Sequence, residues 1–249
     1  MTSRGIQNWD RFRATKIDPE AMLRAASNPM ELAYYGHRGR PAQKWHHYLA
    51  CYDAHLGRFR GTPVRVLELG IDRGGSLQLW KSYFGEHAIV HGIDISEKCR
   101  AAEEERIVCH IGSQADAAFL HRVVDEMGGL DVVIDDGCHI GAQQVVTFET
   151  LYPRMSSDGV YLVEDLHTNY WAKYQGGYRK PDTFVEYAKN AVDRLHAWYI
   201  DDEGADVDDT FARMTHGIFF YDSIVVFAKR RKDPPVRWEA GAAPQGAIT

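Results

Sequence analysis

The stretch Asp131-Val-Val-Ile-Asp-Asp-Gly-Cys-His139 combines a short apolar strand with two adjacent carboxylates and a histidine. A second segment, Gly159-Val-Tyr-Leu-Val-Glu-Asp165, repeats the pattern, because its apolar strand also ends in two acids. In a parallel sheet, the carboxyl ends of neighbouring strands lie side by side, and ligands bind at that edge. We therefore expect both acidic pairs to meet in one crevice, with His139 beside them.

The expected crevice is strongly negative. Two unit charges about 4 Å apart repel by roughly 4 kcal/mol at an effective dielectric constant near 20, so several carboxylates call for a cation or for raised pKa values. Oxygen ligands suit magnesium, calcium or manganese better than zinc. The residues favour a divalent metal held by Asp136, Glu164 and Asp165, with His139 as a general base. The alternative is that these acids only cap helices or carry first-turn charge.

The composition limits the possible classes of protein. The 249 residues, of which 45% are hydrophobic, are enough to build one large α/β domain. The net charge of −6 argues against a nucleic-acid partner, because a nucleic-acid footprint is usually basic. No apolar run is long enough to span a bilayer, and residues 1–16 lack the apolar core of a signal peptide. We therefore predict a cytoplasmic protein without a membrane partner, whose four cysteines are reduced thiols.

A regular alternation of strand and helix begins at residue 64. The expected strands are 64–69, 88–95, 106–111, 131–135 and 160–164, and the helices between them are 76–84, 115–127 and 142–152. This alternation predicts right-handed βαβ units and a doubly wound, mostly parallel sheet. Residues 215–221 and 223–229 predict a C-terminal antiparallel hairpin at the sheet edge, which brings the sheet to seven strands.

The segments outside this core are shorter. Residues 1–60 are expected to form an N-terminal arm, 1–17, and helices at 18–26 and 41–59 that belong to the same domain. Residues 61–232 would form the core of the domain. The last segment, 233–249, is rich in proline, glycine and alanine, and we predict a flexible tail there.

After the fifth expected strand, residues 166–181 are aromatic and polar and contain two adjacent glycines. A long loop without regular structure in a compact domain is often a lid or a binding loop. Residues 182–199 then return to a helical pattern. The aromatic side chains of the loop are candidates for stacking on a substrate, and the alternative is that they pack in the core. The candidates are His167, Tyr170, Trp171, Tyr174 and Tyr178.

A glycine-rich turn, Glu68-Leu-Gly-Ile-Asp-Arg-Gly-Gly-Ser76, joins the first strand to the first helix of the sheet. Such a turn lets a ligand approach the backbone. The dinucleotide fingerprint and the lysine of a phosphate-binding loop are both absent, and the carboxylates of Glu68 and Asp72 would repel a pyrophosphate. A cationic ligand fits better, and S-adenosylmethionine carries both a sulfonium and an amino group.

Two further segments fit the same ligand. Asp94 ends the second strand, where a carboxylate can accept hydrogen bonds from ribose hydroxyls. Residues 112–116 follow the third strand and are placed to form the rim of an adenine pocket. The alternative for Ser113 is that it only caps the following helix.

These motifs resemble those of class I S-adenosylmethionine-dependent methyltransferases, which have a Rossmann-like sheet. More narrowly, the chain resembles the metal-dependent sugar O-methyltransferases of antibiotic biosynthesis, of the mycinamicin and macrocin type. The resemblance covers roughly residues 30–230, and residues 61–232 would be the methyltransferase core. It rests on Glu68-Leu-Gly-Ile, Gly74-Gly-Ser-Leu, Ile134-Asp-Asp-Gly-Cys-His139, Val163-Glu-Asp165 and Tyr170-Trp171.

The resemblance implies roles for particular residues. Magnesium, or manganese, would be bound by Asp136, Glu164 and Asp165, and His139 would be the catalytic base, with Asp135 orienting His139 or the substrate. The substrate contacts would be His167, Tyr170, Trp171 and Tyr178. The cofactor contacts would be Tyr35, Glu68, Gly70, Gly74, Ser76, Asp94, Ile95, Ser113, Gln114, Asp116 and Asp135. The chain departs from the pattern at Cys138, where the family often has serine, and at Tyr35-Gly-His-Arg-Gly39, which replaces a Tyr-Gly-Thr-Asp-Lys-like stretch.

The function implied by the resemblance is methylation of a sugar hydroxyl, of a deoxysugar or rhamnosyl-type glycoside, in natural-product biosynthesis. The partner would be a small-molecule glycoside, and the enzyme would form a homo-oligomer. Three alternatives stay open. The same chemistry could act on a catechol or another vicinal diol, the chain could be an oxygenase-associated relative of the cephalosporin-hydroxylase type, or it could be a non-catalytic binding module with a vestigial cofactor pocket.

Overall fold

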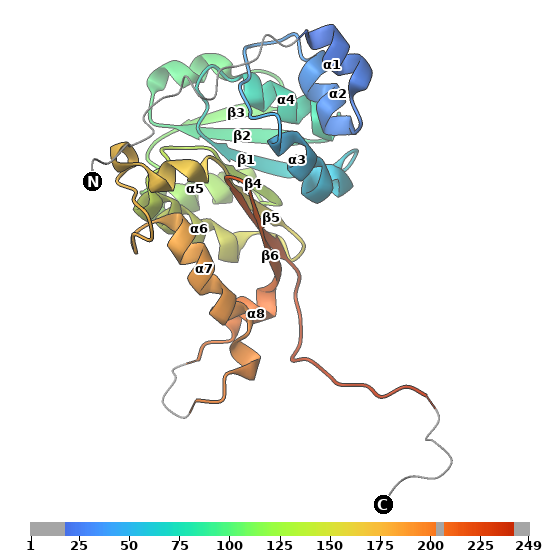
Figure 1. Ribbon diagram of the computed structural model, residues 1–249. Helices are drawn as coiled ribbons and strands as arrows, with labels where there is room; N and C mark the ends of the chain where they lie inside the picture. Colours follow the sequence, from blue (N-terminus) through green and yellow to red (C-terminus); the bar gives the residue numbers. More distant parts are fainter. Residues whose placement is uncertain (1–17, 203–206, 242–249) are drawn as a thin grey trace, which may run out of the picture.

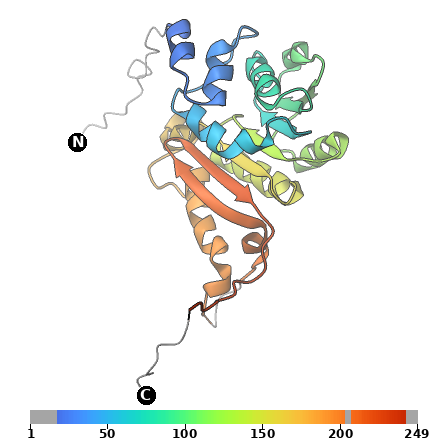
Figure 2. The ribbon, with the colours of Figure 1, turned by 90° about the vertical axis from the view of Figure 1, so that its right-hand side faces the viewer.

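A seven-stranded sheet forms the centre of the computed structural model, which describes residues 18–202 and 207–241 (Figure 1). The strands are β1 (Arg65–Leu69), β2 (Ile89–Asp94), β3 (Ile107–Ile111), β4 (Val132–Asp135), β5 (Val160–Val163), β6 (Thr215–Tyr221) and β7 (Ile224–Lys229). Their spatial order is β3-β2-β1-β4-β5-β7-β6. Strands β1 to β5 pair in parallel, whereas β7 runs antiparallel to both β5 and β6 (Figure 2). The predicted doubly wound sheet and C-terminal hairpin are therefore confirmed.

Helices cover both faces of the sheet (Figure 1). They are α1 (Pro19–Ala25), α2 (Pro29–Gly36), α3 (Tyr48–Leu56), α4 (Gly75–Phe84), α5 (Ala117–Met127), α6 (Gly141–Leu151), α7 (Phe184–Leu195) and α8 (Thr210–Met214). Neighbouring strand residues point to opposite faces, so Val66 packs with α2, α3 and α4, and Leu67 packs with α5, α6 and α7. The buried residues of α2 and α3 thus share one hydrophobic core with the strands.

Two short helices were not expected from the sequence, although one of them carries a clear signal. The Asn28 side chain accepts a hydrogen bond from the Glu31 N–H at 2.9 Å, and the Ser27 N–H donates to the Glu31 carboxylate at 2.7 Å. This reciprocal capping, followed by Pro29 in the first turn, is a recognised helix start. Helix α8 precedes β6, and its Phe211 belongs to the hydrophobic core on the face of the sheet that α5, α6 and α7 cover.

The helix predicted over residues 41–59 is wrong in its first part, because α3 begins only at Tyr48. Residues 37–47 instead run across the carboxyl edge of the sheet, and we call them the strap. The Arg40 N–H donates to the Gln78 side chain at 2.8 Å, and the Arg40 guanidinium pairs with Glu104 at 2.9 Å. A Cβ on Gly75 would overlap the carbonyl oxygen of Pro41, so only glycine lets the strap lie this close to α4.

The segment that follows β5 is more ordered than predicted. It contains two short 3-10 helices, η5 (Leu166–Tyr170) and η6 (Ala172–Tyr174), and α7 follows after a turn. No helix among the described residues is long and apolar enough to cross a membrane. The four cysteines all lie within the described residues and are all free. The predicted arm at 1–17 and the end of the predicted tail at 242–249 lie outside the described residues.

Candidate active site

The two acidic pairs meet at adjacent strand ends, but they are offset by one residue. Asp135 of β4 pairs with Val163 of β5, so Asp136 lies beside Glu164 and Asp165 comes one residue later. Because side chains alternate between the faces of a sheet, Asp135 points to the opposite face from Asp136 and Glu164. Asp165 lies beyond the end of β5, and its left-handed backbone, with φ 54°, places its side chain with Asp136.

Asp135 lies beneath the site rather than in it. Its carboxylate is fully buried and accepts hydrogen bonds from the Gln114 amide at 3.3 Å and from the Tyr161 hydroxyl at 3.2 Å. Burial raises the pKa of Asp135 to about 7. Its side chain therefore supports the end of β4 from below.

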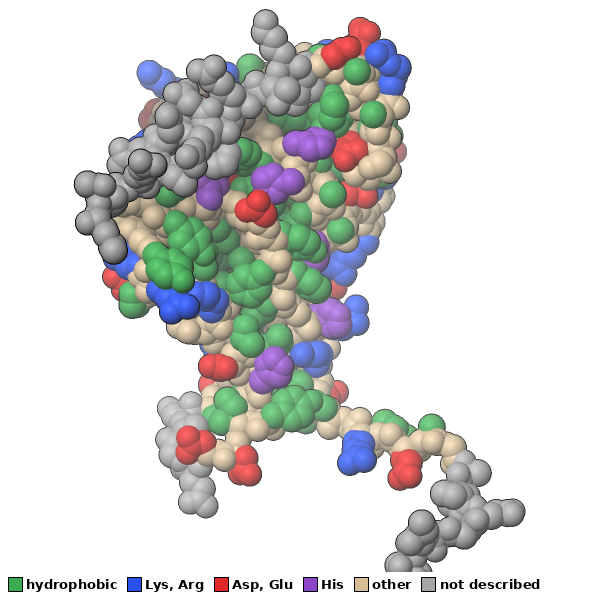
Figure 3. Space-filling model, viewed as in Figure 1, with side chains coloured by type: hydrophobic (Ala, Val, Ile, Leu, Met, Phe, Trp, Pro, Cys, Tyr) green, Lys and Arg blue, Asp and Glu red, His purple; other side chains and the backbone are tan. Residues whose placement is uncertain are grey.

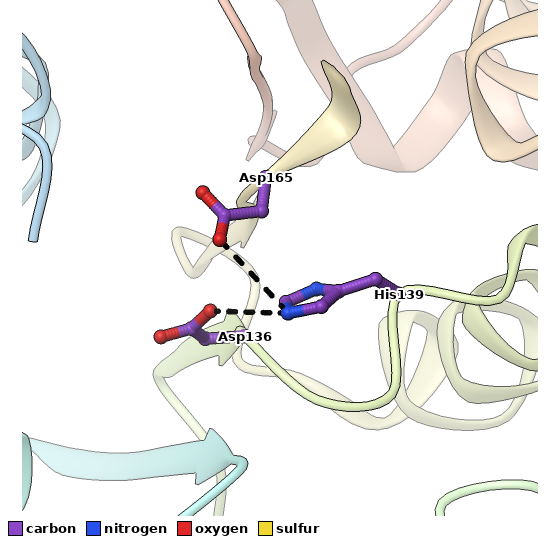
Figure 4. Close-up of side chains that lie close together, drawn as sticks. All are labelled: Asp136, His139 and Asp165. Atoms are coloured by element: carbon purple, nitrogen blue, oxygen red, sulfur yellow. Dashed lines mark ion pairs between the residues drawn. The ribbon is translucent and has the colours of Figure 1, made fainter. Parts of the chain in front are cut away.

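Three side chains converge above the strand ends. Each of Asp136, His139 and Asp165 offers one ligand atom, and these atoms lie within 4.8 Å of one another (Figure 4). The Nε2 atom of His139 is 4.0 Å from Asp136 Oδ1 and 3.9 Å from Asp165 Oδ2. All three side chains remain partly exposed to solvent. The arrangement is compact enough for all three side chains to contact one small cation.

Two of these residues adopt a strained backbone. His139 has φ 58° and Asp165 has φ 54°, which is the left-handed region that favours glycine. Such conformations cost on the order of 1–3 kcal/mol and cluster at functional sites. From these backbone conformations, the side chains of His139 and Asp165 both point into the same crevice.

Glu164 lies deeper than its neighbours and is almost fully buried. Its Oε2 atom accepts a hydrogen bond at 2.9 Å from Lys44, while its buried Oε1 atom has no hydrogen-bond partner among the described residues. Burial raises the pKa of Glu164 well above its usual range, although the nearby Lys44 ammonium opposes the shift. A buried carboxylate oxygen without a partner is a position where a cation would be stabilised.

The residue that sequence analysis missed is Lys44, which comes from the strap. Its ammonium contacts Asp136 Oδ2 at 2.7 Å, Glu164 Oε2 at 2.9 Å and Glu68 Oε1 at 3.3 Å, and its side chain is 2% exposed. Burial alone would lower its pKa, but the three carboxylates raise the pKa well above the usual value. No local pattern marks this lysine, because its partners lie 24, 92 and 120 residues away along the chain.

Glu68, a predicted cofactor contact, is occupied by protein donors. Besides Lys44, it accepts hydrogen bonds from the Trp80 indole at 3.0 Å and from the Ser76 hydroxyl at 2.6 Å. Its carboxylate is fully buried, and it lines neither of the two cavities that the described residues form at this edge. Glu68 therefore holds Lys44 and the start of α4 in place.

Two adjacent cavities open along the glycine-rich turn. The larger, about 560 Å³, is lined by the turn, the strap and the acidic cluster, including Gly70, Ser76, Asp94, Asp136 and His139. The smaller, about 210 Å³, lies toward the ends of β2 and β3. Of the predicted residues, Gly70, Asp94, Ile95, Ser113 and Gln114 line it.

Asp94 shapes the boundary between these cavities. One of its oxygens accepts from the backbone N–H groups of Ile71 and Asp72, at 3.0 and 3.4 Å, and the other accepts from the Ser96 N–H at 2.8 Å.

Gly70 has φ 90°, and a Cβ there would overlap the carbonyl of Asp136. The end of β1 thus lies directly against the end of β4, at the switch point where the chain reverses direction across the sheet.

Five predicted cofactor contacts line neither of the two cavities that the described residues form: Glu68 and Asp135, described above, and Tyr35, Gly74 and Asp116. Tyr35 is buried, and its hydroxyl bonds to the His46 ring. Gly74 is the N-cap of α4 and lies in the left-handed conformation beside Ala102. Asp116 caps α5 by accepting from the Phe119 N–H at 3.0 Å.

The aromatic residues after β5 divide into an inner and an outer group. The Tyr174 ring packs edge-on against His139, with centroids 5.8 Å apart, and Trp171 packs against His167 at 4.8 Å. Tyr170 and Tyr178 are 48% and 78% exposed. On the face of the molecule that Figure 3 shows, histidine and acidic side chains lie among hydrophobic ones in the upper part. The inner group is therefore placed beside the acidic cluster.

Comparison with curated proteins identifies relatives of one kind. The chain is 38% identical over 200 residues to the 8-demethyl-8-alpha-L-rhamnosyl tetracenomycin-C 2'-O-methyltransferase of Streptomyces olivaceus. It is 33% identical over 199 residues to the mycinamicin VI 2''-O-methyltransferase of Micromonospora griseorubida. Each match covers 76% of this chain but 52% and 49% of the relatives, so the chain spans about half the length of the curated relatives it matches. No protein-family model matches the chain.

Comparison with solved structures identifies an enzyme from the same kind of pathway. The MycE methyltransferase from the mycinamycin biosynthetic pathway, in complex with Mg, SAH and mycinamycin VI, matches with a TM-score of 0.70 at 29% identity. The match covers 87% of this chain and 54% of that chain. The class I methyltransferase fold and the resemblance to sugar O-methyltransferases of antibiotic pathways are therefore confirmed, and the chain is a homologue of these enzymes.

Proposed function

We propose that this chain is an S-adenosylmethionine- and magnesium-dependent O-methyltransferase that methylates a sugar hydroxyl of a natural-product glycoside. One observation carries the proposal: Asp136 and His139 line the same cavity as the glycine-rich turn after β1, with Asp165 beside them. The candidate base His139, the carboxylates that could bind a cation and the cavity that could hold a methyl donor thus lie next to one another. The named activities of the homologous proteins support a sugar hydroxyl as the acceptor.

Asp136 and Asp165 offer ligand atoms within 4.8 Å of each other, and we propose that the deeper Glu164 completes the ligands of a divalent cation. The donors are carboxylate oxygens, which magnesium and manganese prefer, and Glu164 Oε1 is buried without a partner among the described residues. Bound there, the ion would supply positive charge that lowers the pKa of a neighbouring sugar hydroxyl. Lys44 leaves at least one oxygen of Asp136 and one of Glu164 available for such an ion.

The two cavities fit S-adenosylmethionine. Their volumes of about 560 and 210 Å³ fall, together, in the range of roughly 300–1,000 Å³ that small-molecule sites occupy. We assign the adenine to the smaller cavity beside Ser113 and Gln114, and the methionine part to the larger one. Asp94 borders both cavities and keeps acceptor capacity for a ribose hydroxyl, because a carboxylate can accept about four hydrogen bonds and the backbone uses three of them.

His139 would remove the proton from the sugar hydroxyl at its Nε2 atom. Asp136 Oδ1 and Asp165 Oδ2 lie about 4 Å from Nε2, where they attract the positive charge that the ring gains with the proton. The Tyr174 ring, packed against the imidazole, limits its motion. We propose that Trp171 and Tyr174 contact the glycoside close to the reacting hydroxyl, and that the exposed Tyr170 and Tyr178 contact it farther out.

Calorimetric titration of S-adenosylhomocysteine, with magnesium and then with chelator, tests the cofactor part of this proposal. We expect binding in both conditions, because the cavity does not need the ion, and no binding in either would contradict the cofactor assignment.

A methyl-transfer assay with a rhamnosyl glycoside and with a catechol tests the acceptor and the metal dependence. Transfer to the glycoside that stops with chelator and returns with magnesium is expected. Full activity in chelator would contradict the metal site, and transfer to the catechol alone would favour the vicinal-diol alternative.

A further inference from the structure

Each carboxylate of the proposed metal site has one oxygen held by a donor from the strap or α3. Lys44 holds Asp136 Oδ2 and Glu164 Oε2. The third acid, Asp165, is held through Oδ1 by the hydroxyl of Tyr48, which donates at 2.8 Å. The donors thus come from two residues, Lys44 and Tyr48, which lie four positions apart in the chain.

The other oxygen of each carboxylate remains available. Asp136 Oδ1 and Asp165 Oδ2 are the oxygens that face His139, and Glu164 Oε1 is the buried atom without a partner among the described residues. The donors therefore hold one oxygen of each acid, and the oxygens of Asp136 and Asp165 that they leave unheld are the ones that lie toward His139. Unheld carboxylate oxygens of this kind are the ligands that a hard divalent cation requires.

Tyr48 makes two contacts with Asp165. Besides donating to the carboxylate, its hydroxyl oxygen accepts a hydrogen bond from the Asp165 backbone N–H at 3.3 Å. Asp165 is in the left-handed backbone conformation, with φ 54°, so its orientation depends on such contacts. Tyr48 is itself 1% exposed and is packed into the core, which gives its hydroxyl a fixed position.

We propose that Tyr48 is a positioning residue for the metal site, which holds Asp165 Oδ1 so that Oδ2 stays directed at the cation. This inference rests on the proposed function, since it assumes the ion held by Asp136, Glu164 and Asp165. Tyr48 does not line the cofactor cavities formed by the described residues, so its effect on the cofactor is indirect. Partners that orient metal ligands typically change metal affinity by about 10- to 100-fold.

The test compares Tyr48→Phe with Tyr83→Phe. Tyr83 is a matched control, because its buried hydroxyl also donates to an aspartate, Asp53 at 2.9 Å, away from the acidic cluster. Manganese affinity, followed by electron paramagnetic resonance, is measured together with S-adenosylhomocysteine affinity and the melting temperature. We expect Tyr48→Phe to weaken manganese binding by about tenfold or more, with unchanged S-adenosylhomocysteine affinity, and Tyr83→Phe to leave both affinities unchanged.

Other outcomes separate this inference from the proposed function. Manganese binding by Tyr48→Phe that equals the wild type would overturn the positioning role, whatever the melting temperature. Equal weakening by both variants, or a parallel loss of S-adenosylhomocysteine affinity, would assign Tyr48 a purely structural role and would also overturn it. If the wild-type protein itself fails to bind manganese or magnesium, the proposed function is contradicted instead.

Discussion

Two lysines are buried at opposite edges of the sheet, and their surroundings differ completely. Lys44 lies at the carboxyl edge among three carboxylates, which raise its pKa. Lys229 ends β7 next to the start of β5, at the amino edge, and its ammonium donates to the carbonyl oxygens of Tyr152 and Met155 at 2.8 and 2.9 Å. Burial without a carboxylate lowers the Lys229 pKa to about 8.

The difference shows what each edge of the sheet is built for. At the amino edge a lysine only satisfies backbone carbonyls at the end of a helix, which is a structural task. At the carboxyl edge the same residue type balances acids that are too close together to be stable by themselves. Changes at the carboxyl edge should therefore alter catalysis and metal binding, whereas changes at the amino edge should alter stability alone.

The largest expected effect is on turnover, in His139→Ala. Loss of a general base typically costs about 10²- to 10⁴-fold in rate, so the methyl-transfer rate should fall by that factor while S-adenosylhomocysteine affinity stays the same. Steady-state kinetics and calorimetry measure the two quantities. His196→Ala, which alters an exposed histidine after α7, is the control and should keep full activity. A rate for His139→Ala within tenfold of the wild type would contradict the base assignment.

The next effect is on stability, in Lys44→Met. Removing one partner of a buried ion pair typically costs about 3–5 kcal/mol, because the carboxylates of Glu68 and Glu164 would stay buried without a cation. Denaturant unfolding in chelator should show this loss, and magnesium should restore part of it by replacing the missing charge.

Lys229→Met is the matched control for that experiment, because it removes the other buried lysine. It leaves two carbonyl oxygens without their donor, at a cost of roughly 1–3 kcal/mol each, and magnesium should not restore this loss. An identical response of the two variants to magnesium would show that Lys44 does not balance the acidic cluster.

The smallest expected effect is the pH dependence caused by Lys229. Its pKa is about 8 in the folded protein and about 10.5 in the unfolded chain, so between these values the unfolded chain binds more protons. The free energy of unfolding of the wild type should therefore rise with pH in this window, relative to Lys229→Met. The rise is at most about 1.4 kcal/mol per pH unit. Unfolding curves of both proteins at pH 8 and pH 10 measure it, and parallel curves would contradict the lowered pKa.

Much of the fold was predictable because it depends on local patterns. The period-2 and period-3.6 patterns placed the seven strands, and the helices between the parallel strands, within a few residues, and the acid pairs fell at strand ends. The sequence analysis failed where tertiary contacts override the pattern. Residues 41–47 have helical spacing of apolar residues, but they do not form a helix, and in the loop that they adopt Lys44 reaches the acids and Pro41 lies against Gly75.

Sequence motifs are enough to identify the residues that could form the site: the acids of β4 and β5, His139 and the glycine-rich turn. The role of each of these residues depends on contacts that only the folded chain makes. The register of β4 and β5 places Asp136 level with Glu164, so the alternation of side chains leaves Asp135 on the opposite face from both. Lys44 and Tyr48 reach the acids across at least 92 residues of chain. Electrostatic and hydrogen-bond partners are chosen by distance in space, and sequence spacing carries no record of that distance.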